Sequence, residues 1–143
     1  MKQIMSPKFS FLLEAPLEVL HSESLEWLQE IEFWKDESAF FYVLIIGRTK
    51  KNTPAFNTKN AKDVERHLVY VSAEKLDDLI MEVKAHERLL AGLMDSLRPD
   101  EQLYRSRHRR ITAKIHAFEN EFKEMKIKIF SLAKKITPKK ALQ

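Results

Sequence analysis

The sequence predicts an all-α fold: an elongated, antiparallel up-down-up bundle of three helices with coiled-coil-like packing. Three observations support this prediction. The 143 residues include only 2 glycines, too few turn residues for a fold of many short strands. Apolar residues recur at alternating steps of three and four over long stretches. This spacing places them in one stripe along a helix, which we call its seam. Prolines fall between these stretches, where they separate one helix from the next.

The first predicted helix covers residues 22–49 and follows a leader at residues 1–21. Ser22 or Ser24 can cap its start, because a serine hydroxyl accepts hydrogen bonds from the backbone N–H groups of the first turn. Its seam residues are Trp27, Ile31, Trp34, Ser38, Phe41 and Ile45. A second apolar stripe beside the seam consists of Leu28, Phe33, Phe40 and Leu44. So wide an apolar surface predicts that this helix contacts two or more neighbours.

The second and third predicted helices cover residues 59–97 and 100–136. Thr58 or Asn60 can cap the second helix, and Pro99 suits the opening turn of the third. The seam of the second helix is predicted at Ser72, Leu76, Leu79, Val83, His86, Leu90, Leu93 and Leu97. The seam of the third is predicted at Tyr104, His108, Ile111, Ile115, Phe118, Phe122, Met125, Ile129, Leu132 and Ile136.

Short connections make successive helices antiparallel, so the third helix is expected to run parallel to the first. We therefore divide the chain into the leader, a single helical-bundle domain at residues 22–137 and a basic tail at residues 138–143. The strongest apolar run, residues 40–46, is far shorter than the about 20 residues that span a bilayer, so no membrane span is expected. With no signal-peptide pattern at the start, we expect a cytoplasmic protein.

Two histidines occupy seam positions and give the most suggestive polar cluster in the chain. His86 and His108 are predicted about one turn apart, and Glu82 lies one turn before His86 on the same helix face. One interpretation is a metal or proton-handling site built from these three residues. The other is a hydrogen-bonded histidine layer that fixes the register of the helices, as polar core positions can do. We favour the second. A di-iron bundle needs inward carboxylates on two helices and Glu-x-x-His motifs on two others, and the three predicted helices do not supply this set.

No other feature predicts an enzyme or a cofactor. The chain has no cysteine, which removes thiolate catalysis and thiolate metal sites. Its two glycines, Gly47 and Gly92, are isolated, so there is no glycine-rich phosphate loop. No nucleophile constellation can be assembled from the spacing of the residues. We therefore expect a non-enzymatic protein without a cofactor.

The basic residues raise the alternative of nucleic-acid binding. The formal net charge is +4, and a basic patch is predicted at Arg105, Arg107, Arg109 and Arg110. However, the region from Pro16 to Glu37 holds seven acidic residues and one lysine, whereas that from Lys123 to Lys140 holds seven lysines and one glutamate. The two regions lie on neighbouring helices and can neutralise each other. We therefore regard nucleic acid as the less favoured partner.

Apolar residues outside the seams favour an interaction protein. A bundle of three helices does not easily bury Phe33, Phe40 and Leu44. Contiguous exposed apolar patches usually mark interfaces. Either the leader packs on them as a fourth element, or a second copy of the chain does so in a homodimer. An unidentified protein partner is the remaining possibility.

The stretch LEWLQEIEFWKDESAFF, at residues 25–41, contains the pattern Trp-x-x-Glu-hydrophobic-x-Phe-aromatic-Lys-Asp-Glu. The start of the second helix, Val64-Glu65-Arg66-His67-Leu68, adds a second distinctive stretch. In both, the chain resembles small bacterial helical proteins that have no established activity, in which such a helix is followed by two longer ones. The resemblance implies a helical bundle and carries over no catalytic residue.

Overall fold

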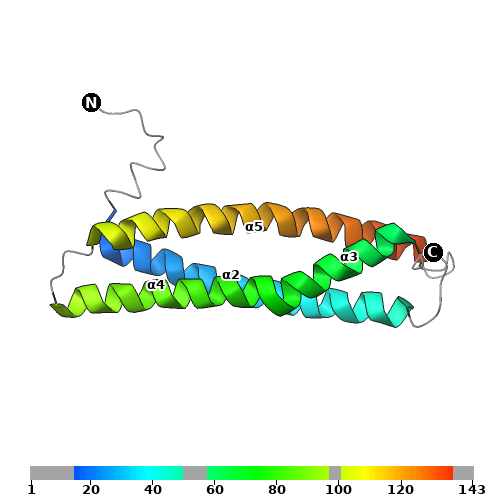
Figure 1. Ribbon diagram of the computed structural model, residues 1–143, viewed down its shortest axis with the longest axis horizontal. Coiled ribbons are helices and arrows are strands. Elements are labelled where there is room, and N and C mark those ends of the chain that lie inside the picture. The colour runs from blue at the N-terminus through cyan, green and yellow to red at the C-terminus, as the bar shows by residue number, and fades with distance from the viewer. Residues whose placement is uncertain (1–14, 50–57, 97–100, 137–143) are drawn as a thin grey trace, which may run out of the picture. The chain divides into compact units, whose positions relative to one another are not determined.

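The computed structural model describes residues 15–49, 58–96 and 101–136. Its elements, in chain order, are α2 (Leu17–Thr49), α3 (Lys59–Tyr70), the π-helical turn η2 (Val71–Lys75), α4 (Leu76–Ser96) and α5 (Glu101–Ile136), as drawn in Figure 1. These described ranges contain no strand, and the predicted all-α helical bundle is confirmed. Within the described ranges, packing groups the chain into two compact units, residues 15–31 with 78–117 and residues 32–77 with 118–136.

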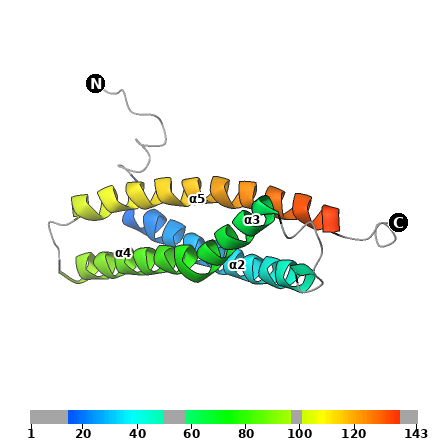
Figure 2. The same cartoon turned by 45° about the vertical axis from the view of Figure 1, so that its right-hand side comes forward.

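The first unit contains the start of α2, most of α4 and the first half of α5. The α4 and α5 segments are antiparallel, because His86 contacts His108 whereas Glu82, one turn earlier, contacts Lys114, further along α5. The first turns of α2 and α5 lie side by side in Figures 1 and 2. A core cluster at one end of this unit consists of Ala15, Leu20, Leu90, Leu93 and Tyr104.

The second unit contains the rest of α2, α3, η2 and the second half of α5. Here α2 and α5 run parallel, because Trp34 contacts Phe118 at a ring-centroid distance of 4.9 Å and Phe41 contacts Phe130 at 5.5 Å. This agrees with the expectation that the third helix runs parallel to the first.

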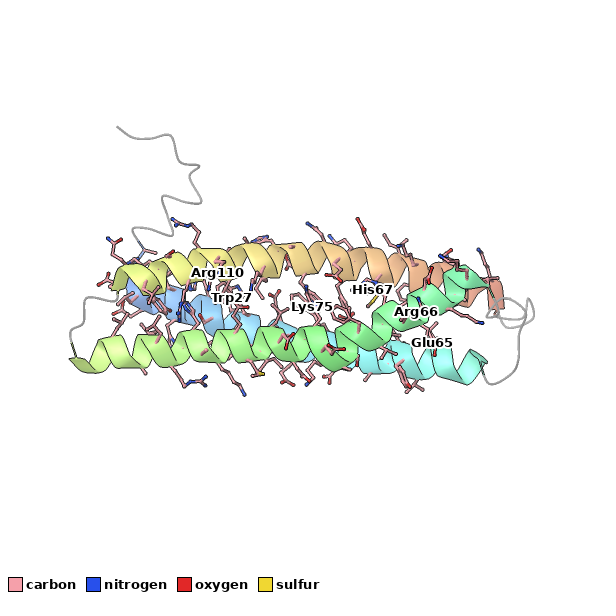
Figure 3. The ribbon with its side chains drawn as sticks, in the orientation of Figure 1. Trp27, Glu65, Arg66, His67, Lys75 and Arg110 are labelled. Carbon is pink, nitrogen blue, oxygen red and sulfur yellow. The ribbon has the colours of Figure 1, made fainter. Side chains whose placement is uncertain are left out.

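Glu121 of α5 holds the start of the second predicted helix in this unit. It pairs with His67 of α3 at 2.7 Å and with Lys75 of η2 at 3.9 Å. His67 and Lys75 are labelled in Figure 3, and α3 lies beside the second half of α5 in Figures 1 and 2. One carboxylate thus ties both α3 and η2 to α5.

The first helix begins earlier than the sequence predicts. It starts at Leu17 rather than at residue 22, so residues 17–21 of the predicted leader belong to α2. Ser22 and Ser24 lie within the helix and do not cap it. Instead, the Pro16 carbonyl accepts hydrogen bonds from the first turn. The physical reason is burial: Leu20 continues the seam one turn before Ser24, and burying it stabilises the added turn.

The second predicted helix contains a π-helical turn that changes its seam. Ser72 was expected in the seam, but Val71 is fully buried there and Ser72 is half-buried. The Leu76 backbone N–H donates to the Val71 carbonyl, five residues back. Such a turn holds one more residue than an α-helical turn. The seam therefore steps by five residues from Val71 to Leu76, and both halves of the helix still face the core.

Most other seam predictions are confirmed. All six seam residues of the first helix are buried, as are those from Leu76 to Leu93 and from Tyr104 to Leu132. Thr58 caps α3 as predicted, its side chain accepting a hydrogen bond from the Ala61 N–H at 3.1 Å. Predictions for residues 1–14, Leu97, Pro99 and the tail at 138–143 lie outside the described residues, as does the side chain of Ile136. Across the described ranges, no helix has an apolar stretch long enough to cross a membrane.

Candidate functional site: a buried histidine pair

The histidine pair lies inside the first unit. His86 comes from α4 and His108 from α5, and their side chains are almost completely buried. The two rings are hydrogen-bonded, with 2.9 Å between Nε2 of His86 and Nδ1 of His108. Both residues occupy seam positions, so the heptad spacing that buries their neighbours also turns these imidazoles into the core. The sequence prediction that His86 and His108 lie close together agrees with this geometry.

A carboxylate continues the hydrogen-bonded chain toward the surface. Nε2 of His108 lies 2.7 Å from Oε1 of Glu23 on α2. An ionised carboxylate only accepts, so His108 donates from Nε2, and its Nδ1, when neutral, accepts from Nε2 of His86. This assignment leaves Nδ1 of His86 as an acceptor, and that atom is buried without a hydrogen-bond partner. The chain of atoms therefore runs from the half-buried Glu23 to a buried basic nitrogen.

Two aromatic rings hold the imidazoles in place. Trp27 of α2 stacks on His108 with ring centroids 4.5 Å apart, and Tyr104 of α5 stacks on His86 at 4.1 Å with nearly parallel planes. Stacking of this kind adds to the stabilisation from burying the rings. Trp27 and Arg110 are labelled in Figure 3, on α2 and α5 respectively. The pair is thus a packed layer with its ring planes fixed from both sides.

Burial keeps the histidines neutral. It is the largest cause that lowers the pKa of His86 to about 3, followed by the repulsive charges of His108, Arg107 and Arg110. Burial also lowers the pKa of His108, although the Glu23 carboxylate opposes that shift. For Tyr104, burial and the charge of Glu87 raise the pKa of the phenol. The whole layer is therefore uncharged at neutral pH apart from Glu23 at its edge.

Glu82 does not join the histidines. Its carboxylate binds Lys114 through both oxygens, at 2.9 and 3.1 Å. Among the described residues, no group of three or more histidine, cysteine, aspartate or glutamate side chains is arranged to hold a metal ion. Of the predicted ligand set, the fold brings His86 and His108 together and leaves Glu82 on the surface.

One arginine of the predicted basic patch makes contacts within the first unit. Arg105 donates to the Ala15 carbonyl at 2.6 Å and pairs with Glu101 at 3.0 Å, so it ties the beginning of α2 to α5. Arg107 and Arg109 are half-buried, and Arg110 is exposed. The four arginines therefore do not form one uniformly exposed basic surface.

Sequence reasoning missed three members of the layer. Trp27 and Tyr104 were predicted as core residues but not as neighbours of the histidines, and Glu23 was counted only among the acidic residues between Pro16 and Glu37. The available signal was spacing, because Glu23 lies four residues before the seam residue Trp27 and so shares its helix face. Contacts between helices also depend on their relative height, which the heptad spacing alone does not give.

The predicted interface residues lie in the second unit. Phe33 and Phe40 on α2 are 66% and 63% exposed, and Leu44 is half-buried. Phe40 contacts the buried Phe41, which in turn contacts Phe130 of α5, itself 49% exposed. We call Phe33, Phe40, Leu44 and Phe130 the α2–α5 apolar face. The buried Phe41 thus links Phe40 of α2 to Phe130 of α5 beneath this face.

Comparison with known proteins adds no function to this geometry. No protein family, curated protein or solved structure matches the chain.

Proposed function

We propose that the protein is a non-enzymatic interaction protein whose α2–α5 apolar face binds a second copy of the chain. The observation that carries this proposal is the exposure of Phe33 and Phe40, one heptad apart on α2. Burying a large apolar side chain contributes about 1.5–3 kcal/mol, so leaving these rings in water is costly. Exposed apolar residues that form a contiguous face, rather than scattered ones, mark protein interfaces.

Charge favours a second copy as the occupant of this face. At its centre, Glu37 of α2 pairs with Lys126 of α5 at 3.3 Å. Residues 32–43 of α2 hold three acidic residues and one lysine, whereas residues 123–135 of α5 hold five lysines and one glutamate. A two-fold axis through the face places the acidic α2 of one copy against the basic α5 of the other, and the reverse. The same rotation brings the two sets of phenylalanine rings together.

Light scattering on the full chain, after size-exclusion chromatography, tests the proposal. The wild-type protein is expected to have a dimeric mass, and Phe33→Gln/Phe40→Gln is expected to weaken dimerisation at least about tenfold, because the buried rings contribute most of the binding energy. The matched control is Met81→Gln/Leu103→Gln, which changes two large apolar side chains of the first unit that are 67% and 44% exposed. A monomeric wild-type protein, or equal weakening by the control, contradicts a dimer through this face.

A further inference from the structure

The first unit contains a cavity that the proposed dimer does not use. Its volume is about 210 Å³, and it is lined by Leu17, Glu18 and His21 of α2 and by Glu87, Leu90 and Ala91 of α4. Leu90 belongs to the core cluster at this end of the unit, and Leu17 packs against that cluster. The cavity therefore has an apolar wall continuous with the core.

Glu87 gives the cavity its polar character. One of its carboxylate oxygens, Oε1, pairs with Nδ1 of His21. The other, Oε2, is buried and has no hydrogen-bond partner. A buried carboxylate oxygen is a strong acceptor, and leaving it without a donor is unfavourable. The Glu87 side chain is 17% exposed, so its negative charge acts on the cavity and attracts a cation.

The lining also restricts the chemistry of a ligand. Two carboxylates, Glu18 and Glu87, repel anions. A bare metal ion fits poorly, because half of the lining residues are apolar and no metal-binding group of three acidic, histidine or cysteine side chains exists among the described residues. A water molecule takes about 30 Å³ of liquid, so the cavity holds roughly six to eight non-hydrogen atoms. An alkyl chain of about five or six carbons with one charged nitrogen has this size.

We propose that this cavity binds a small primary ammonium compound. The ammonium group pairs with the negative charge of the Glu87 carboxylate, and the alkyl chain packs between Leu17 and Leu90. A primary ammonium has three donors, which lets it reach Glu87 and the carboxylate of Glu18 at the rim. Desolvation of the alkyl chain against leucine supplies the apolar part of the affinity.

Titration of the isotope-labelled full chain, followed by NMR, tests this site with hexylammonium, 1-hexanol and hexanoate. The three probes share one alkyl chain and differ only in the charge of the head group. Hexylammonium is expected to bind saturably, with shifts at His21, Glu87 and Ala91, at least about tenfold more tightly than 1-hexanol, and hexanoate most weakly. Equal binding of the three probes, or no saturation with hexylammonium at about 10 mM, overturns the proposal.

Variants then assign the binding to the cavity. Glu87→Gln keeps the shape of the side chain and removes its charge, and it is expected to weaken hexylammonium binding about tenfold while leaving 1-hexanol unchanged. Gly92→Ala is the matched control, because a Cβ added at Gly92 meets no atom within 4 Å. Unchanged affinity in Glu87→Gln, or an equal loss in Gly92→Ala, overturns the proposal. Because the ligand series uses the wild-type chain, it decides the question even where a variant folds poorly.

Discussion

At the scale of single residues, the histidine layer shows how a bundle keeps polar groups in its core. Each imidazole donates or accepts within the layer, and the one charged member, Glu23, remains 32% exposed at its edge. A carboxylate that keeps part of its hydration avoids most of the cost of burying a charge. Two neutral imidazoles can then be buried, because their hydrogen bonds are largely satisfied. The layer thus needs no metal ion to be stable.

Removing His108 is expected to destabilise the protein strongly. His108→Ala opens a cavity beside Trp27 and leaves both Glu23 and His86 without their hydrogen-bond partner. We expect the free energy of unfolding to fall by about 3 kcal/mol or more, measured by urea denaturation followed by circular dichroism. His116→Ala, an exposed histidine two turns along the same helix, is the control and should change the stability by no more than about 0.5 kcal/mol. Equal losses in the two variants would contradict a structural role for the layer.

At the scale of helices, the sequence predicts the elements well because burial follows a repeating pattern. The seams of α2 and α5 can be predicted from the alternation of three- and four-residue steps between apolar residues, which is visible in the sequence. The start of α2 was misplaced because serine is a good cap in isolation, whereas the burial of Leu20 favours a longer helix. The contacts of Glu23 and Tyr104 could not be derived, because they depend on the relative height of helices to within one turn.

The π-helical turn marks another limit of pattern reading. A strict heptad places Ser72 in the seam, whereas the seam up to the first residue of η2 consists of Ala61, Val64, Leu68 and Val71. The sequence does indicate the π-helical turn, because Val71 and Leu76 are five residues apart and a regular α-helix cannot bring both onto one face. An inserted residue of this kind is accommodated by widening one turn rather than by rotating the rest of the helix.

Deleting one residue from η2 is expected to cost little stability. Removal of Ser72 shortens the five-residue step to four, so the seam from Ala61 to Leu93 follows alternating steps of three and four throughout. We expect a loss below about 1 kcal/mol, together with a regular α-helix at this place, checked by urea denaturation and NMR chemical shifts.

Deleting Lys84 from α4 is the matched control for this prediction. It removes an exposed residue but rotates every later seam residue by about 100° relative to the earlier ones, and it should cost several kcal/mol. If the deletion of Ser72 destabilises as much as that of Lys84, the π-helical turn is required by the fold rather than tolerated by it.

At the scale of the whole molecule, the buried histidines determine how stability depends on pH. The folded pKa of His86 is about 3, whereas its unfolded value is 6.5. Between these values the unfolded chain binds a proton that the folded chain excludes, so unfolding is favoured as pH falls. The charged or titratable groups around His86 are His108, Arg107 and Arg110 and the stacked Tyr104, all of α5. Glu23 of α2 and Glu87 of α4 act on His108 and Tyr104. The lowered pKa of His108 acts in the same direction.

We therefore expect the free energy of unfolding to be highest near pH 7 and to fall by about 1 kcal/mol per pH unit for His86 below pH 6.5. Urea denaturation at pH 7, 6 and 5 measures this slope in a range where most carboxylates are still ionised. His86→Gln keeps a polar side chain without a titrating group. The free energy of unfolding of this variant should fall less steeply with decreasing pH, by the contribution of one proton. A wild-type stability that does not change from pH 7 to 5, or an unchanged slope in His86→Gln, would mean that His86 takes up its proton equally in the folded and the unfolded chain.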